Sequence, residues 1–393
     1  MSVYLDYAAT TPVDPRVLEA MLPYFTQHAG NASSMHAFGQ EARAAVDRAR
    51  VEVAGLLGAR PGEIVFTSGA TEADNLAILG VALAPSAHGG AARGAAEDGG
   101  GGRRHVITSA IEHHAVLEAC HFLEQRGHEV TIVPVGASGI VDPDDIRRAV
   151  RPDTALISVM AANNEIGTLQ PVAEIGAIAR EHGVPFHSDA TQWVGALPAR
   201  VDDLRVDLLS LSGHKRYGPK GIGALYVRTG TPLVPLQRGG GHERGRRGGT
   251  ENVPGIVGLG AALRIAGGEM EDEGERLTAL RDRVIAGALE MSGVVLNGDP
   301  GRRLPNNVNL SVEGTDSQSL VIALDLRGVA VSAGSACSSG TLEASHVLSA
   351  LGVPPERAMS AVRLTLGRPT TAAEIDEALE ALRTVVTQLR QAA

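Results

Sequence analysis

The chain has 393 residues, of which 44% are hydrophobic and 20% charged, and its net charge is −10. This length predicts about two to three domains with a sizeable core. The acidic balance and the 3% aromatic content argue against direct nucleic-acid binding, and no run approaches the ~18 apolar residues of a membrane span. Two cysteines cannot form a disulfide framework, and the N-terminus lacks signal-peptide features, so we expect a cytoplasmic protein.

An arm with two prolines occupies residues 1–15, and helical periodicity follows at 15–25 and 39–57. A Gly/Ala-rich stretch at 85–104 has nothing apolar to bury and predicts a surface loop. Strand-like runs, each bounded by glycine or polar residues, recur at 63–67, 105–109, 129–134, 155–160, 184–188, 206–209 and 224–227. Because helical segments separate these runs, we predict an α/β fold with a mainly parallel sheet and helices on both faces.

A long helical region follows, in two parts at 255–268 and 271–291, and bridges to a second domain. Shorter elements come after it, with strands at 294–296, 307–311, 329–331 and 361–365, a helix at 317–326 and an amphipathic helix after 371. We therefore predict a large domain at 15–255 and a smaller α+β domain made of 1–14 and 256–393.

One lysine stands where a buried run ends. The stretch 206–209 is apolar, and the polar residues after it lead to Lys215. In isolation a lysine is more often a solvated surface charge. The preceding strand-like run, however, ends in Asp189 and Gln192, and in open α/β sheets ligands lie at the carboxyl ends of strands. A lysine for the aldehyde and an aspartate for the ring nitrogen are the partners that pyridoxal phosphate requires.

A second candidate site lies at residues 68–72, where a strand, a glycine turn and a helix start follow one another. The first N–H groups of a helix are unpaired and its dipole favours negative charge, so we expect a phosphate there. The alternative is that Ser68 or Thr71 only caps the helix.

The two cysteines have different surroundings. Cys120 falls in a helical apolar pattern and is expected to be buried, whereas small and polar residues flank Cys337 and expose its thiol. A reactive and an inert Cys337 both remain open, because reactivity depends on an environment that favours the thiolate. Cys120 with His113, His114 and His121 is a weak zinc pattern, so we expect no metal site.

Motifs along nearly the whole chain carry a resemblance to a known family. They are Tyr4–Pro12, Phe66–Glu72, Thr108–His113, Asn163–Gly167, Asp189–Gln192, Ser212–Lys215, Gly240–Gly245, Ser335–Cys337 and Arg363–Gly367. Together they resemble the cysteine desulfurases of the IscS/NifS type, pyridoxal-phosphate enzymes of the class V aminotransferase family. The resemblance implies fold type I, with a seven-stranded-type sheet in the large domain.

The resemblance also implies roles for single residues. Lys215 would hold pyridoxal phosphate and act as the base at the substrate Cα, Asp189 would pair with the ring nitrogen, and His113 would stack on the ring. Ala70, Thr71, Ser212 and His214 would hold the phosphate, Gln192 and Asn164 would bind near the ring hydroxyl, and Thr250 would reach the phosphate of a neighbouring subunit in a homodimer. Arg363, with Asn164, would bind the substrate carboxylate.

By the same resemblance, the Cys337 thiolate would attack the sulfur of L-cysteine, leaving a persulfide on the enzyme and releasing L-alanine. An iron–sulfur scaffold or another acceptor, such as the tRNA thiolation machinery, would take the sulfur, and Cys337 would be a candidate transient cluster ligand. Two enzymatic alternatives of the same fold are a selenocysteine lyase and an aminotransferase, and a non-enzymatic alternative is a sulfur-carrier or scaffold protein. One departure from the family pattern is the loop at 31–34.

Overall fold

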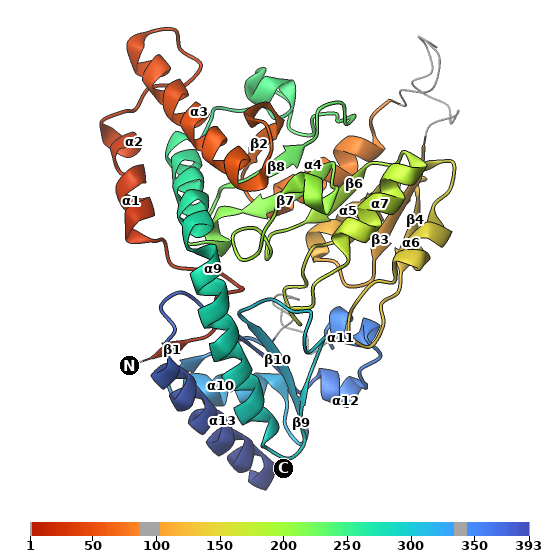
Figure 1. The fold of residues 1–393 in the computed structure, drawn as a ribbon, viewed down its shortest axis with the longest axis vertical. Coiled ribbons are helices and arrows are strands. Elements are labelled where there is room, and N and C mark those ends of the chain that lie inside the picture. The colour runs from red at the N-terminus through yellow and green to blue at the C-terminus, as the bar shows by residue number, and fades with distance from the viewer. Residues whose placement is uncertain (1, 86–102, 334–343, 393) are drawn as a thin grey trace.

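The computed structural model describes residues 2–85, 103–333 and 344–392. Two predictions therefore lie outside the described residues: most of the Gly/Ala-rich stretch, and Cys337 with its flanking residues. The chain forms a large sheet domain and a smaller domain, joined by one long helix (Figure 1).

The large domain is built on a seven-stranded sheet with the order β2-β8-β7-β6-β5-β3-β4. Its strands are β2 (Ile64–Thr67), β3 (His105–Ser109), β4 (Glu129–Val133), β5 (Thr154–Ser158), β6 (Phe186–Asp189), β7 (Leu208–Ser212) and β8 (Gly223–Val227). Among these seven strands β8 alone runs opposite to the other six, so its pairings with β2 and β7 are antiparallel and the remaining pairings are parallel. The central strands are buried from end to end, which explains their continuous apolar runs, because helices cover both faces. The predicted mainly parallel α/β fold is confirmed.

The helices of the large domain are α1 (Pro15–Met21), α2 (Pro23–Thr26), α3 (Ala37–Leu57), α4 (Ala70–Ala82), α5 (His114–Glu124), α6 (Pro143–Ala149), α7 (Val172–His182) and α8 (Val201–Leu204). Apolar residues of α4 and α5 pack on one face, and those of α3 and α7 contribute to the core on the other. The single helix predicted at 15–25 is two helices, because Pro23 has no N–H to continue the first one and instead opens the second.

The helix α9 (Val253–Leu289) is one continuous helix of 37 residues. The sequence had indicated a division near residues 269–270. A glycine pair at 267–268 costs a helix only about 1 kcal/mol per residue relative to alanine, and Glu269 is held there by two ion pairs. The first half of α9 packs on the large domain through Ile256 and Leu259, and its last turns pack on the small domain through Val284 and Ala288.

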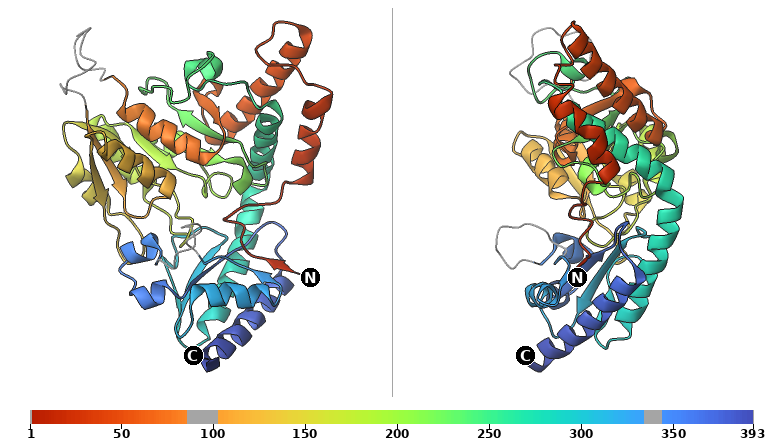
Figure 2. Two further views of the ribbon diagram at one scale, coloured as in Figure 1. Left: turned by 180° about the vertical axis from the view of Figure 1, so that it is seen from behind. Right: turned by 90° about the vertical axis from the view of Figure 1, so that its left-hand side faces the viewer.

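The small domain contains a three-stranded antiparallel sheet, β12-β10-β9, and a two-stranded parallel pair, β1-β11. Its elements are β1 (Val3–Tyr4), β9 (Val294–Leu296), β10 (Asn307–Val312), α10 (Ser317–Asp325), β11 (Val329–Ala330), α11 (His346–Ala350), α12 (Pro355–Ala358), β12 (Ala361–Thr365) and α13 (Ala372–Ala392). The chain thus begins in the small domain and crosses to α1 as an extended arm, beside the junction of the two domains (Figure 2).

Candidate active site

A cavity of about 740 Å³ lies where the parallel strands of the large sheet end. This volume is typical of a small-molecule or cofactor site. Its walls include most residues that the sequence had singled out, namely Ala70, Thr71, His113, Asn164, Asp189, Gln192, Ser212, His214, Lys215 and Arg363. Thr250, which is exposed, is not among the lining residues.

Lys215 ends a short 3-10 turn, η2 (Gly213–Lys215), that follows β7 directly. Its Nζ donates hydrogen bonds to the carbonyl oxygens of Ala8 at 2.7 Å and Ala9 at 2.8 Å, both in the N-terminal arm. Burial, and then the positive charge of Arg363, lowers the pKa of Lys215 to about 8. The amine is therefore ready to react with an aldehyde near neutral pH.

Lys215 and Lys220 are the only lysines in the whole sequence, beside many arginines, and both line this cavity. Arginine is unsuited to forming a bond with an aldehyde, since it stays protonated. Any covalent attachment of a carbonyl compound through lysine is thus confined to these two positions.

Asp189 is the last residue of β6 and is buried. Its Oδ1 accepts a hydrogen bond from the Thr191 amide at 2.9 Å, and no arginine, lysine or histidine of the described residues forms an ion pair with it. A buried carboxylate without a cation is costly. A positively charged ligand group in the cavity would therefore stabilise the buried Asp189 carboxylate.

Two buried titratable groups near Asp189 have shifted pKa values. Asp74 of α4 lines the same cavity and is buried, and its burial and the charge of Asp189 raise the pKa of Asp74 well above its ordinary range. His187 Nε2 lies 2.9 Å from Ser210 Oγ, and burial lowers the pKa of His187 to about 4. Burial thus disfavours the charged forms of both Asp74 and His187 beside Asp189.

The turn before α4 is the helix start at which the sequence predicts a phosphate. Gly69 is the N-cap and provides no side chain to bond the first turn. The Ser68 amide donates to Glu72 Oε2 at 2.6 Å, and Ser212 at the end of β7 and His214 in η2 line the same cavity. The alternative in which Ser68 or Thr71 caps the helix is not observed. A side chain at Gly223 would bring a Cβ to 2.7 Å from the Gly69 carbonyl carbon, so glycine lets β8 approach this turn.

Arg363 of β12 enters the cavity from the small domain and is only 2% exposed. Its Nη2 donates to Asp6 Oδ1 at 2.8 Å, and its Nη1 donates to the Asn164 carbonyl oxygen at 3.0 Å. Its Nε has no partner in the described structure. The guanidinium is thus fixed in orientation, and each of its two Nη atoms has a second N–H that can donate to a carboxylate.

His113 is the N-cap of α5, where its Nδ1 accepts a hydrogen bond from the Ala115 amide at 3.1 Å. The neutral ring therefore carries its hydrogen on Nε2. The surrounding protein desolvates the ring and lowers the pKa of His113, although the residue is exposed where it lines the cavity. Gln192 is held by a hydrogen bond from its Nε2 to the Ala8 carbonyl oxygen at 3.1 Å.

Three residues near the site were missed by sequence reasoning. Asp6 stands in the N-terminal motif, Asp74 in the helix after the anion turn, and Glu112 directly before His113. Glu112 is buried, accepts hydrogen bonds from the Ser109 hydroxyl and the Met160 amide, and has its pKa raised to about 8 by burial. All three are charged residues inside an apolar run or a motif of the family. Since charged residues are seldom buried without a partner, this position was the signal that could have identified them.

Comparison with known proteins agrees with this geometry. The profile "Aminotransferase class-V" matches residues 3–378. The chain belongs to the class-V aminotransferase family. Within it, a curated relative from Dictyoglomus turgidum, "Cysteine desulfurase IscS", is 52% identical over 389 residues, which are 99% of this chain and 95% of that protein. A protein of the same name from Methanosarcina thermophila is 50% identical, with 99% and 93% of the two chains covered.

Solved structures give the same family. A chain titled "NIFS-LIKE PROTEIN" superposes with a TM-score of 0.89 at 37% identity and covers 99% of this chain and 100% of its own. Another, titled "SspA in complex with cysteine", has a TM-score of 0.80 at 40% identity, with 93% and 99% covered. The family and the fold type expected from the sequence are confirmed.

Enzymes of this family use pyridoxal phosphate, and the cavity fits that cofactor. It offers a lysine amine for the aldehyde, a buried carboxylate without a cation for the protonated ring nitrogen, and a helix N-terminus without a side-chain cap for the phosphate. In the described ranges, no helix is long and apolar enough to cross a membrane, and no group of three or more His, Cys, Asp or Glu side chains is arranged to hold a metal ion.

Proposed function

We propose that this chain is a pyridoxal-phosphate-dependent cysteine desulfurase, which converts L-cysteine to L-alanine and transfers the sulfur to Cys337. The activity and the cofactor agree with the names of its curated relatives, two of which match 99% of the chain at 50% identity or more. The observation that carries the proposal is the convergence of Lys215, Asp189 and Arg363 on one cavity.

Each of these residues has a task that its environment supports. The bound cofactor supplies an electron sink for the substrate Cα. Arg363 binds the substrate carboxylate with its remaining Nη N–H groups, and the Asn164 carbonyl holds the guanidinium in place. Lys215, whose amine titrates near neutral pH, takes the proton from Cα, and Asp189 keeps the ring nitrogen positively charged.

The sulfur step requires a thiolate. In the proposal, the Cys337 sulfur forms a bond to the substrate sulfur while the carbon–sulfur bond breaks. The electron pair of that bond stays with carbon, which is then protonated on the way to alanine. Cys120 cannot take this role, because it is buried and its burial raises the pKa of the thiol to about 12.

The proposal extends to the partners and the compartment. Leu22, Phe25, Met35 and Phe38 are large apolar side chains that are 55–90% exposed on and beside α1–α3, and covering them in a homodimer would remove this surface from water. Thr250, exposed at the end of the glycine-rich segment 239–250, would then reach the cofactor phosphate of the partner subunit. We place the enzyme in the cytoplasm, where thiols stay reduced, with an iron–sulfur scaffold or another sulfur acceptor, such as the tRNA thiolation machinery, as its partner.

The products test the reaction type. Purified protein loaded with pyridoxal phosphate is incubated with L-cysteine and a reducing thiol, and alanine, sulfide and keto acids are quantified. The proposal predicts alanine and sulfide in equal amounts without added keto acid, lost in Cys337→Ala and kept in Cys120→Ala. A requirement for a keto acid acceptor would indicate an aminotransferase, and activity on L-selenocysteine alone would indicate a selenocysteine lyase. A chain that binds no cofactor would be a carrier or scaffold.

A further inference from the structure

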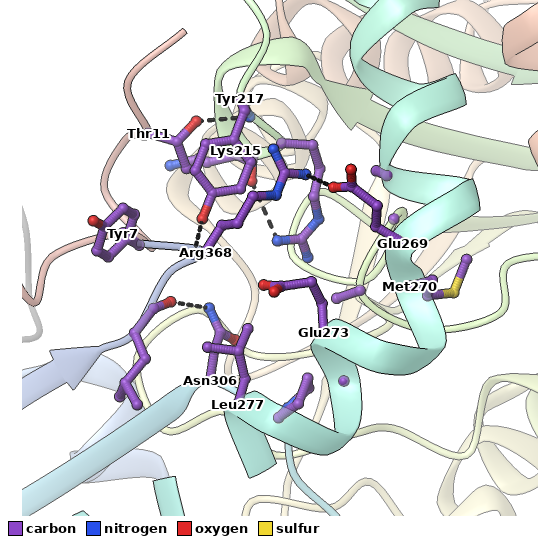
Figure 3. A pocket seen from close by; sticks show the side chains of 17 residues that line it. Tyr7, Thr11, Lys215, Tyr217, Glu269, Met270, Glu273, Leu277, Asn306 and Arg368 are labelled. Carbon is purple, nitrogen blue, oxygen red and sulfur yellow. Dashed lines mark hydrogen bonds and ion pairs between the residues drawn. The ribbon is translucent and has the colours of Figure 1, made fainter. Parts of the chain in front are cut away.

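A second, smaller cavity lies on the other side of the segment 215–217, between α9 and the small domain. Figure 3 shows Arg368 in its wall, with Tyr217 on one side and Glu269 on the other. Neither Arg368 nor Tyr217 has a role in the reaction described above, yet Tyr217 follows Lys215 by two residues and Arg368 follows Arg363 by five.

Four charged side chains form a closed ring at this place, which we call the clamp. Asp14 Oδ2 lies 2.7 Å from Arg16 Nη2 and 2.6 Å from Arg368 Nη1. Glu269 lies 2.6 Å from Arg16 Nη1 and 3.0 Å from Arg368 Nη2. Each arginine therefore bridges the same two carboxylates. The hydrogen bonds from Arg16 lower the pKa of Asp14 and of Glu269, so both are charged at neutral pH.

The clamp joins three parts of the molecule. Asp14 and Arg16 lie at the start of α1 in the large domain, and Glu269 lies on α9, the helix that connects the domains. Arg368 follows β12 of the small domain. A network that fixes one guanidinium against two separate elements restricts movement between domains more than an isolated surface ion pair does.

Tyr217 connects the clamp to the segment that carries Lys215. The Arg368 guanidinium lies over the Tyr217 ring, 4.4 Å from its centroid, and the Arg368 amide donates to the Tyr217 hydroxyl at 2.5 Å. The Tyr217 amide donates to Thr11 Oγ1 at 2.8 Å, and its carbonyl accepts from the Asp14 amide at 2.9 Å. These contacts hold Tyr217 at a φ of +57°, which is strained for a residue with a Cβ.

We propose that Arg368 is a positioning residue, which fixes the spacing between Arg363 of the small domain and Lys215 of the large domain by holding Tyr217, Asp14 and Glu269 together. The inference rests on the proposed function, in which Arg363 binds the substrate carboxylate and Lys215 acts at Cα. A substrate must engage both residues at once, so a change in their spacing weakens binding of any amino acid in the site.

Binding of L-alanine, the product, tests this spacing without sulfur transfer. The dissociation constant is measured from the change that L-alanine causes in the absorbance of the cofactor-loaded enzyme, and KM and kcat for L-cysteine are measured beside it. We expect Arg368→Met to raise the alanine dissociation constant and the KM for cysteine by about tenfold or more, as for a lost charged contact, while kcat changes less. Arg368→Lys keeps the charge but not the two-sided pairing, and is expected to restore only part of the affinity.

Arg283→Met is the matched control, because Arg283 pairs with Asp376 between α9 and α13 and does not contact Tyr217. Tyr217→Phe removes only the hydroxyl and is expected to raise the same constants by about threefold. Should Arg368→Met fail to fold, Glu269→Gln weakens the clamp from the other side and is expected to act in the same direction. If the alanine dissociation constants of these variants stay within twofold of the Arg283→Met value, the proposal is overturned. A wild-type enzyme that binds alanine but forms no persulfide would instead overturn the proposed function alone.

Discussion

The active-site cavity has two halves that are built in different ways. The cofactor half consists of Asp189 and Ser212, which end the neighbouring strands β6 and β7, of Lys215 just after β7, and of the start of α4 after β2. The substrate half is Arg363 with Asp6, whose side chains meet although they lie 357 residues apart in the chain. The first half follows from sheet topology, whereas the second depends on how the small domain and the N-terminal arm dock. Substitutions in the two halves should therefore have different kinetic signatures.

The largest effect is expected from Lys215→Ala. The variant lacks the amine that binds the cofactor aldehyde and takes the Cα proton, so activity should fall by about a thousandfold or more. The absorbance of the lysine-bound cofactor should also disappear. Lys220→Ala is the control, since it removes the only other lysine. Borohydride reduction followed by peptide mapping should place the cofactor on Lys215, and a label on Lys220 would contradict the assignment.

Asp189→Asn should be the next most damaging change. It removes the negative charge that stabilises the protonated ring nitrogen, and kcat should fall by about a hundredfold or more. Asp74→Asn is the matched comparison in the same cavity, because burial and the charge of Asp189 raise the pKa of Asp74 well above its ordinary range, so an amide changes the charge less there than at Asp189. We expect Asp74→Asn to stay within about threefold of the wild type. Equal losses of kcat in the two variants would show that Asp74 and Asp189 share the negative charge.

The substrate half should respond in KM instead. In Asp6→Asn, Arg363 loses its carboxylate partner but keeps the bond to the Asn164 carbonyl, so its orientation becomes less fixed. We expect the KM for L-cysteine to rise about tenfold, with a smaller change in kcat, and cofactor retention to be unaffected. Loss of the cofactor from this variant would mean that the two halves are not separable.

The smallest expected effect is a shift in pH dependence. The pKa of Lys215 is lowered to about 8, mainly by burial and then by Arg363, while Asp189 and Asp6 act in the opposite direction. Only the neutral amine attacks an aldehyde, so the rate at which cofactor-free protein binds pyridoxal phosphate should increase as pH rises through about 8. Removing the positive charge in Arg363→Met should move this midpoint to higher pH. A midpoint that stays fixed would show that burial alone sets it.

The same two halves differ in how far the sequence predicted them. Apolar runs ending in Asp189 and Lys215 predicted buried strands, and the rule that ligands bind at strand ends placed these residues together. Nothing in the local pattern pairs Asp6 with Arg363 or Arg368 with Tyr217, because each contact depends on the docking of segments far apart in the chain. The apparent division of α9 arose in the same way, since a local glycine signal was outweighed by contacts of Glu269 with distant arginines.

The central claim is that sulfur passes from L-cysteine to Cys337 in this cavity. The most direct test is a single turnover of cofactor-loaded enzyme with L-cysteine and no reductant, followed by quantification of alanine and by mass analysis of the peptide that contains Cys337. We predict one alanine for each active site and a gain of about 32 Da, one sulfur atom, on Cys337. Alanine without added mass on Cys337, or a keto acid in its place, would contradict the account.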